Sequence, residues 1–214
     1  MDVLDKYKKA WVNQPEDNRQ LSSKEIYKLA HSSSSSLVKW IFIIGILEFI
    51  FWGVINFLVP DSFYKIYEDL NLETFLQVFT VFHYIILIAF LYLFYQNYTN
   101  ISLVDNTKKL IKKILKVRKT VNYYVYYNLA IIVLVSFVIN AKIFSNPEKH
   151  LDIINPDNLA MDLSQIVTIS IISQIIAVIV ILVLFWLFYK LIYGIFLRKL
   201  NKNYKELSKL DESN

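Results

Sequence analysis

The sequence predicts an all-α polytopic membrane protein, with four transmembrane helices in one antiparallel bundle and a small cytosolic helical layer. Apolar residues make up 56% of its 214 residues and charged residues only 19%, a balance richer in apolar side chains than that of soluble domains. Four apolar runs are each long enough to cross a hydrocarbon core about 30 Å thick at about 1.5 Å per helical residue. The segments between these runs alternate between basic and acidic composition.

The apolar runs divide the chain into three parts. Residues 1–36 form a cytosolic N-terminal amphipathic segment, residues 37–193 the transmembrane domain, and residues 194–214 a cytosolic basic tail. The four spans cover about residues 37–59, 75–95, 121–140 and 166–193.

The N-terminal segment is polar and contains two helical patterns. Residues 2–12 have the apolar spacing of a short amphipathic helix, and residues 13–18 have the composition of a loop. Ser22 and Glu25 have the spacing of a capping box, which starts a second helix. The serine run Ser32–Ser36 fits either a hinge or a polar extension of that helix into the first span.

The first span, Leu37–Val59, carries one acid, Glu48, at its midpoint. The span is too long for the apolar core of a signal peptide, and no small-residue cleavage site follows it. A charged carboxylate at mid-bilayer is costly, so we expect Glu48 to face protein or water, or to be protonated. Gly45, Trp52 and Asn56 lie on the same side of the helix as Glu48. We expect this side to face the bundle, because small and polar residues allow close helix contact.

His83 on the second span lies close to Glu48 in depth and is its predicted neighbour. One interpretation is that the two side chains serve a proton or ion path. The other is that Glu48, neutral or ion-paired, fixes helix packing and register. The sequence favours the second interpretation, because transporters normally carry more intramembrane charge, broken helices and internal repeats. Asn56, Gln174 and Ser136 are further polar candidates on the first, fourth and third spans.

The distribution of charge predicts the orientation of the spans. Residues 96–120 carry seven lysines and arginines and the tail carries five, whereas residues 60–74 and 141–165 together contain three lysines and eight of the 18 acids. Short loops follow the positive-inside rule. We therefore expect a protein of the bacterial inner (cytoplasmic) membrane, with the N and C termini cytoplasmic and all four spans consistent with that orientation.

A basic amphipathic helix is predicted over about residues 102–120, capped by Ser102 or Asp105 and continuous with the third span. Together with the tail and the N-terminal segment it is expected to form a cytosolic layer. The expected partners are the lipid bilayer, further copies of the chain in a homo-oligomer, and a cytosolic protein bound through residues 1–36 and the 102–120 helix. Nucleic acid is not an expected partner, since topology already accounts for the basic charge.

Aromatic residues gather at the ends of the predicted spans. Rings of this kind prefer the headgroup level of a bilayer, so we interpret them as interfacial anchors rather than as a stacking platform for bases or a pigment. The set comprises Trp40, Tyr92, Phe94, Tyr95, Tyr123, Tyr124, Tyr126, Tyr127, Trp186, Tyr189 and Tyr193.

Little in the sequence points to catalysis. The three histidines, His31, His83 and His150, belong respectively to the cytosol, the membrane and the outer loop, so they cannot converge on one metal. The chain has no cysteine and no HExxH, GxSxG, P-loop or GxGxxG motif. We therefore expect no catalytic residue, no metal and no cofactor, and the predicted protein is not an enzyme.

Two stretches of the chain are distinctive: LSSKEIYKLAHSSSSSLVKWIFIIGILEFIFW and NISLVDNTKKLIKKILKVRKTVNYYVYYN. On these stretches the chain resembles small uncharacterised four-span inner-membrane proteins of Flavobacteria and their relatives. Some of them carry an automatic label as carotene monooxygenase, but that chemistry needs four histidines on one iron, and this chain has three. Some are encoded beside sigma factors, which implies at most a membrane-bound regulatory role. The resemblance identifies no functional residues.

The expected function is therefore that of an integral inner-membrane protein acting through interactions, for example as a membrane-bound regulator or sensor. The alternative is a small oligomeric transporter, channel or membrane effector in which Glu48 and His83 line the path. A third possibility, a membrane enzyme acting on a lipid-soluble substrate, is disfavoured by the separated histidines.

Overall fold

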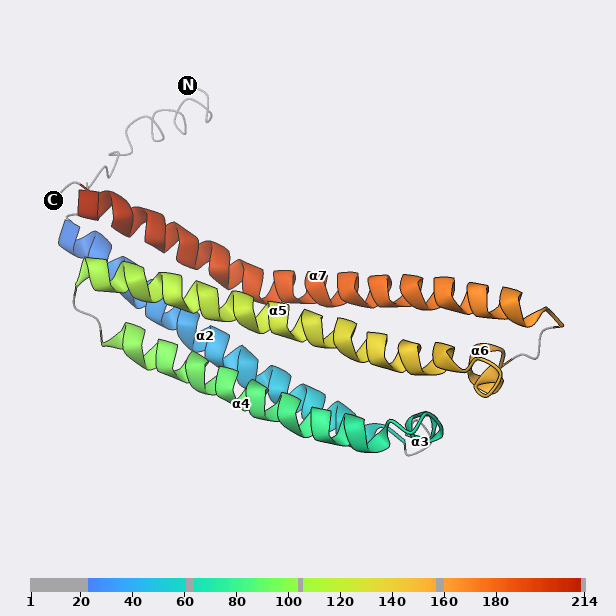
Figure 1. The fold of residues 1–214 in the computed structure, drawn as a ribbon. Coiled ribbons are helices and arrows are strands. Elements are labelled where there is room, and N and C mark those ends of the chain that lie inside the picture. Colours follow the sequence, from blue (N-terminus) through green and yellow to red (C-terminus); the bar gives the residue numbers. More distant parts are fainter. Residues whose placement is uncertain (1–22, 61–63, 104–105, 157–159, 213–214) are drawn as a thin grey trace, which may run out of the picture.

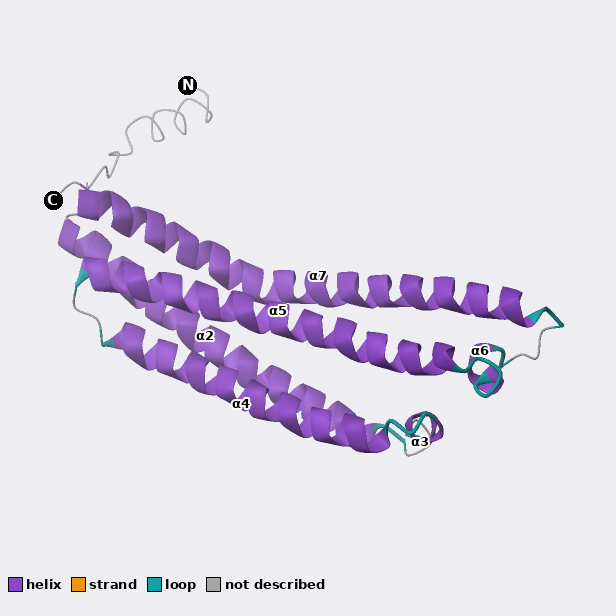
Figure 2. Cartoon of the chain, in the orientation of Figure 1, coloured by secondary structure: helices purple, strands orange, loops and turns teal. Residues whose placement is uncertain are grey.

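A computed structural model describes residues 23–60, 64–103, 106–156 and 160–212. These residues form four long helices and two short ones, and no strand occurs among them (Figure 2). Each long helix contains a stretch that is long and apolar enough to cross a membrane. The long helices are α2 (Ser23–Leu58), α4 (Glu73–Ser102), α5 (Thr107–Ser145) and α7 (Leu163–Glu212), and the short ones are α3 (Lys65–Asp69) and α6 (Leu151–Ile154).

The four long helices contact one another in a closed ring. Helix α2 lies against α4 and α7, and α5 lies against the same two helices. Figure 1 shows the start of α2, the end of α4, the start of α5 and the end of α7 together at one end, and α3 and α6 at the other. We call the first the basic end, because it carries the lysines of residues 107–120 and of the tail, and the second the acidic end.

The main core lies between the middle of the helices and the basic end. Each long helix contributes a side chain that is at most 1% exposed, and the same core continues toward the basic end through further fully buried aliphatic residues. By contrast, α7 has no buried residue between Ile166 and Tyr189. The first group is Ile41, Phe94, Val121 and Tyr193, and the second is Ile101, Leu110, Ile114, Leu200 and Leu207.

A second, smaller core lies at the acidic end. Leu70 and Leu72, on either side of the α3–α4 turn, pack with Ile143 near the end of α5. Asn71 between them has a φ of 53°, in the left-handed region, which asparagine tolerates better than most residues. The turn therefore carries two apolar side chains onto α5 and ties the α2–α4 hairpin to the α5–α7 hairpin at this end.

The N-terminal segment is described only in part. Residues 2–12, residues 13–18 and Ser22 lie outside the described residues. Helix α2 begins at Ser23, carries Glu25 in its first turn and remains helical through Ser32–Ser36. The serine run is therefore a helical extension of the first apolar stretch and not a hinge.

The start of α5 differs from the sequence prediction. The helix begins at Thr107, and its cap is Asn106, whose side-chain oxygen accepts hydrogen bonds from the backbone N–H of Lys108 at 2.9 Å and of Lys109 at 3.4 Å. Of the two predicted caps, Asp105 lies outside the described residues, and Ser102 cannot cap the helix because it is the last residue of α4 and its hydroxyl donates to the carbonyl of Thr99. Asparagine in an extended conformation is among the preferred helix caps.

Candidate functional site

Glu48 is buried inside the ring of helices, with only 6% of its surface exposed. It lies on the same side of α2 as Gly45, where α4 approaches closely. A Cβ added at Gly45 would lie 3.1 Å from side-chain carbons of Leu91 and Phe94. The absent side chain at Gly45 thus allows α4 to cover this side of α2 one turn from the carboxyl group.

Tyrosines of α5 and α7 surround the carboxyl group of Glu48. The hydroxyl of Tyr193 donates a hydrogen bond of 2.8 Å to Oε2 of Glu48. Tyr189 lies one turn away on α7, and its ring stacks on that of Tyr193 with centroids 6.1 Å apart. Tyr124 of α5 packs edge-on against the rings of Tyr189 and Tyr193, with centroids 6.1 and 5.9 Å apart, so all three rings gather beside the carboxyl group that Tyr193 binds. We call Glu48 and these three tyrosines the carboxyl–tyrosine cluster.

One oxygen of this carboxyl group has no partner. Oε1 of Glu48 is buried and makes no hydrogen bond within the described part of the chain. No lysine, arginine or histidine of that part forms an ion pair with Glu48 either. Of the two states considered for Glu48, neutral or ion-paired, the ion pair is therefore not formed among these residues. Hydroxyl donors stabilise a buried carboxyl group without the cost of burying a second charge.

The sequence predicted His83 as the neighbour of Glu48, but the partner of His83 in the structure is Tyr127. Its Nδ1 lies 3.0 Å from the hydroxyl of Tyr127 on α5, and the two rings stack with centroids 5.6 Å apart. The contact of Gly45 with α4 sets an antiparallel register in which His83 lies roughly 10 Å nearer the acidic end than Glu48. Phe90 packs against both Tyr124 and Tyr127, so aromatic rings fill the space between the two polar groups.

Asn56 and Gln174 lie far from the carboxyl–tyrosine cluster and are exposed. Asn56 accepts a hydrogen bond of 3.3 Å from the hydroxyl of Tyr64, just before α3. Two steps of four residues separate it from Glu48, and each step turns about 40° beyond a full revolution, so Asn56 has rotated off the buried side. Gln174 lies in the part of α7 that has no buried residue. The predicted polar group of Glu48, His83, Asn56 and Gln174 is thus dispersed.

The interfacial-anchor interpretation missed the three tyrosines of the cluster. Tyr124, Tyr189 and Tyr193 are at most 5% exposed, and Phe94 is buried beside them. Several of the other rings are exposed, as interfacial anchors would be: Trp40, Tyr92, Tyr95, Tyr123, Tyr126 and Trp186. The spacing of Tyr189 and Tyr193 places both on one side of a helix, but nothing in a single sequence shows that this side meets Glu48.

A second group of polar contacts joins the helices at the basic end. The side-chain amide of Asn203 on α7 donates to the hydroxyls of Ser33 and Ser34 on α2, at 3.1 and 2.9 Å. His31 of α2 bonds through Nε2 to the carbonyl of Ile101 on α4, at 2.9 Å. Arg118 of α5 donates to the side chain of Asn201 on α7, at 2.9 Å. These bonds connect all four helices around the buried aliphatic residues of the basic end.

The surface of the basic end keeps most of its positive charge. Within the described residues only two ion pairs form there, Lys108 with Asp211 and Lys202 with Glu206, and both have exposed lysines. Several other lysines of α5 point to the surface without an acidic partner among those residues: Lys109, Lys112, Lys116 and Lys119. No group of three potential metal ligands occurs in the described residues, at this end or elsewhere.

A family model described as "Domain of unknown function (DUF8845)" matches residues 24–212. No curated protein and no solved structure matches the chain.

Proposed function

The chain belongs to the DUF8845 family, and we propose that it is an integral protein of the bacterial inner membrane that binds a partner protein in the cytoplasm through its basic end. In this proposal both termini are cytoplasmic and the four apolar helices cross the bilayer. The partner carries an acidic surface, because the exposed charge of the basic end is positive. The membrane fixes this surface close to the inner leaflet.

The lengths of the helices support this placement. Helix α7 has 50 residues and is about 75 Å long, more than twice the roughly 30 Å thickness of a hydrocarbon core. Its apolar stretch lies toward the acidic end, and the lysines and arginine of its tail lie at the basic end. A large part of α7 therefore projects beyond the lipid on the side that the positive-inside rule assigns to the cytoplasm.

The packing of the basic end is the observation that carries the proposal. Leu110 and Ile114 of α5 and Leu200 and Leu207 of α7 are fully buried there, next to lysine-rich surface. Helices that only anchor a protein in lipid have no need of a closed core outside it. A packed core combined with interhelical hydrogen bonds gives a rigid surface, and a rigid surface loses little entropy on binding.

Transport through Glu48 and His83 is the alternative, and the geometry favours it less. Aromatic rings fill the space between the two side chains, and the carboxyl group is enclosed by tyrosines. Proton flux in proteoliposomes tests this alternative directly. A wild-type flux that is abolished in Glu48→Gln would support transport, and the absence of wild-type flux would exclude it.

Site-specific photocrosslinking in intact cells tests the proposed interaction. A photoreactive residue placed at Lys112, which is exposed on α5 at the basic end, is expected to form one discrete adduct with an acidic protein. The matched position is Leu184, which is exposed on the apolar part of α7 and should contact lipid. The proposal fails if Lys112 gives no protein adduct, or if both positions give the same one.

A further inference from the structure

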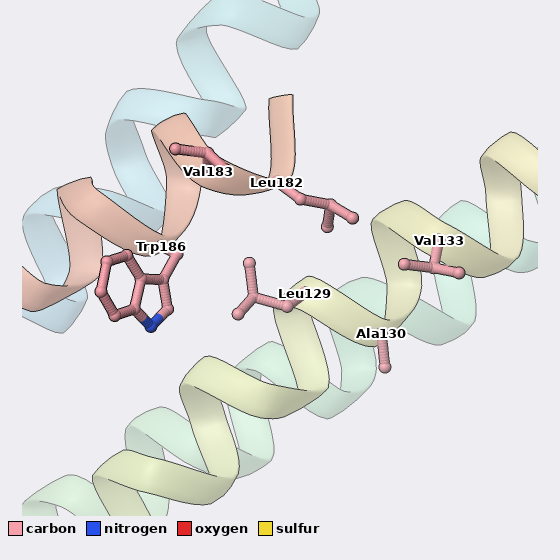
Figure 3. A pocket seen from close by; sticks show the side chains of 6 residues that line it. All are labelled: Leu129, Ala130, Val133, Leu182, Val183 and Trp186. Carbon is pink, nitrogen blue, oxygen red and sulfur yellow. The ribbon is translucent and has the colours of Figure 1, made fainter. Parts of the chain in front are cut away.

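A cavity of about 410 Å³ opens on the side of the molecule between α5 and α7. In Figure 3 the side chains of Leu129 and Leu182 extend into the space between the two helices, and the ring of Trp186 lies at one end of it. All of its lining residues are apolar, and three come from each helix: Leu129, Ala130, Val133, Leu182, Val183 and Trp186. We call this cavity the α5–α7 groove. Its volume and its apolar lining suit a hydrocarbon chain.

Positive charge lies at the end of the α5–α7 groove that faces the basic end. The ammonium group of Lys190 lies over the ring of Trp186, 4.3 Å from its centroid, and Lys190 is one helical turn nearer the basic end. On α5, Lys119 lies over the ring of Tyr123 at 5.5 Å. Steps of four, three and four residues lead from Lys119 through exposed Tyr123 and Tyr126 to Ala130 in the groove. These residues therefore share one side of α5.

No acidic side chain of these two helices is available to neutralise Lys190. Residues 107–145 of α5 and residues 163–205 of α7 contain no aspartate or glutamate. The two ion pairs of the described residues involve Lys108 and Lys202, and Glu48 is sealed behind Tyr193. The anion that would complement Lys190 must come from outside these helices. The α5–α7 groove is apolar and ends at a lysine without an acidic partner among the described residues and at an indole ring. The apolar part suits the acyl chain of a lipid, and the lysine and indole suit its headgroup.

We propose that the α5–α7 groove binds one anionic glycerophospholipid. One acyl chain lies along the groove between the leucines of the two helices, and the phosphate group binds the ammonium of Lys190 beside Trp186. Lys119 adds positive potential on the facing helix. This proposal rests on the proposed membrane placement, since only an embedded groove meets lipid laterally. The proposal assigns a lipid ligand to the part of α7 that has no buried residue.

Native mass spectrometry of the detergent-purified full chain tests this assignment. Phosphatidylglycerol and phosphatidylcholine with identical acyl chains are added at equal concentration. We expect one phosphatidylglycerol per chain, retained about fivefold better than phosphatidylcholine, as expected for one lysine at a lipid headgroup. Equal retention of the two lipids would overturn the proposal.

Two pairs of matched variants locate the lipid. Lys190→Gln should remove the preference for phosphatidylglycerol, whereas Lys202→Gln, the same change on the same helix at a lysine paired with Glu206, should keep it. Ala130→Phe fills the groove and should reduce retention of both lipids, whereas Ala177→Phe at an exposed position of α7 should not. Circular dichroism confirms that each variant is folded. Lys190→Gln changes only an exposed side chain, so it remains informative if Ala130→Phe does not fold.

Two other results are distinguishable. If a second copy of the chain occupies the α5–α7 groove, the spectra will show a dimer that Ala130→Phe dissociates while lipid retention is unchanged, and the lipid proposal is then wrong. If the protein is extracted from cells without detergent, the membrane placement itself fails before any lipid is measured. A detergent-dependent protein that retains no phosphatidylglycerol contradicts the groove assignment alone.

Discussion

Tyr193 of α7 donates a hydrogen bond of 2.8 Å to the carboxyl group of Glu48 on α2, so the last long helix is tied to the first by two buried side chains. The bond lies inside the main core, next to Tyr124 of α5 and to Phe94 of α4. All four long helices therefore meet around one polar contact. The bond joins buried side chains of α2 and α7 and therefore helps to fix the depth of these two helices relative to each other.

Removing the donor should destabilise this arrangement. Tyr193→Phe leaves Oε2 of Glu48 buried without its hydrogen bond, which typically costs about 1–3 kcal/mol. Glu48→Gln should cost less, because its amide oxygen still accepts from Tyr193. The midpoint of unfolding in detergent, followed by circular dichroism, measures both effects. Tyr126→Phe is the matched control, since that residue is exposed, and an equal loss in Tyr126→Phe and Tyr193→Phe would contradict the role given to the bond.

The two glycines of the first apolar stretch should respond differently to substitution. Gly45→Val places side-chain carbons against Leu91 and Phe94, where a Cβ alone is already 3.1 Å from them, so α4 must shift and stability should fall. Gly53 has no atom within 4 Å of an added Cβ, so Gly53→Val should be neutral or slightly stabilising, because glycine is a poor helix former. Unfolding midpoints of the two variants provide the comparison. Equal destabilisation at both positions would show that α4 does not approach α2 at Gly45.

The sequence predicts the helical class and the four apolar stretches because these depend on length and composition, which are local properties. Pairing between helices is not local. The predicted contact of Glu48 with His83 was wrong because depth was inferred from the midpoints of the spans, whereas the register depends on Gly45 meeting Leu91 and Phe94. Asn56 was placed on the buried side because a four-residue spacing looks constant over one turn, although its rotation accumulates over two.

The burial of the aromatic residues also depends on pairing between helices and not on local sequence. Tyr123, Tyr126 and Trp186 are exposed, as interfacial anchors would be, whereas Tyr124 and Tyr193 are buried. Both groups have the same composition and lie in the same stretches of sequence. Only the neighbouring helix decides which tyrosine becomes a hydrogen-bond donor to Glu48, and that neighbour is not encoded in the spacing of one helix.

The closed core of the basic end should be as sensitive as the core of a soluble domain. Leu200 is fully buried between the helices, so Leu200→Ala should lower stability by about 2–5 kcal/mol through lost contacts and a residual cavity. Leu191, nine residues earlier on α7, is 65% exposed, and Leu191→Ala should change stability little. Differential scanning fluorimetry in detergent measures both. If Leu200→Ala is as mild as Leu191→Ala, the basic end is not the rigid surface on which the proposed interaction depends.

Labelling of single cysteines should establish the orientation of the helices. The chain contains no cysteine, so each introduced thiol is the only reactive one. Lys149→Cys, exposed at the acidic end between α5 and α6, should react with a membrane-impermeant maleimide in intact spheroplasts. Lys112→Cys, exposed at the basic end, should react only after the membrane is opened, because the positive-inside rule assigns the twelve basic residues of the 96–120 segment and the tail to the cytoplasm. Denatured samples of both variants control for thiol reactivity. The reverse pattern would place the basic end outside the cytoplasm and would remove its surface from any cytoplasmic partner.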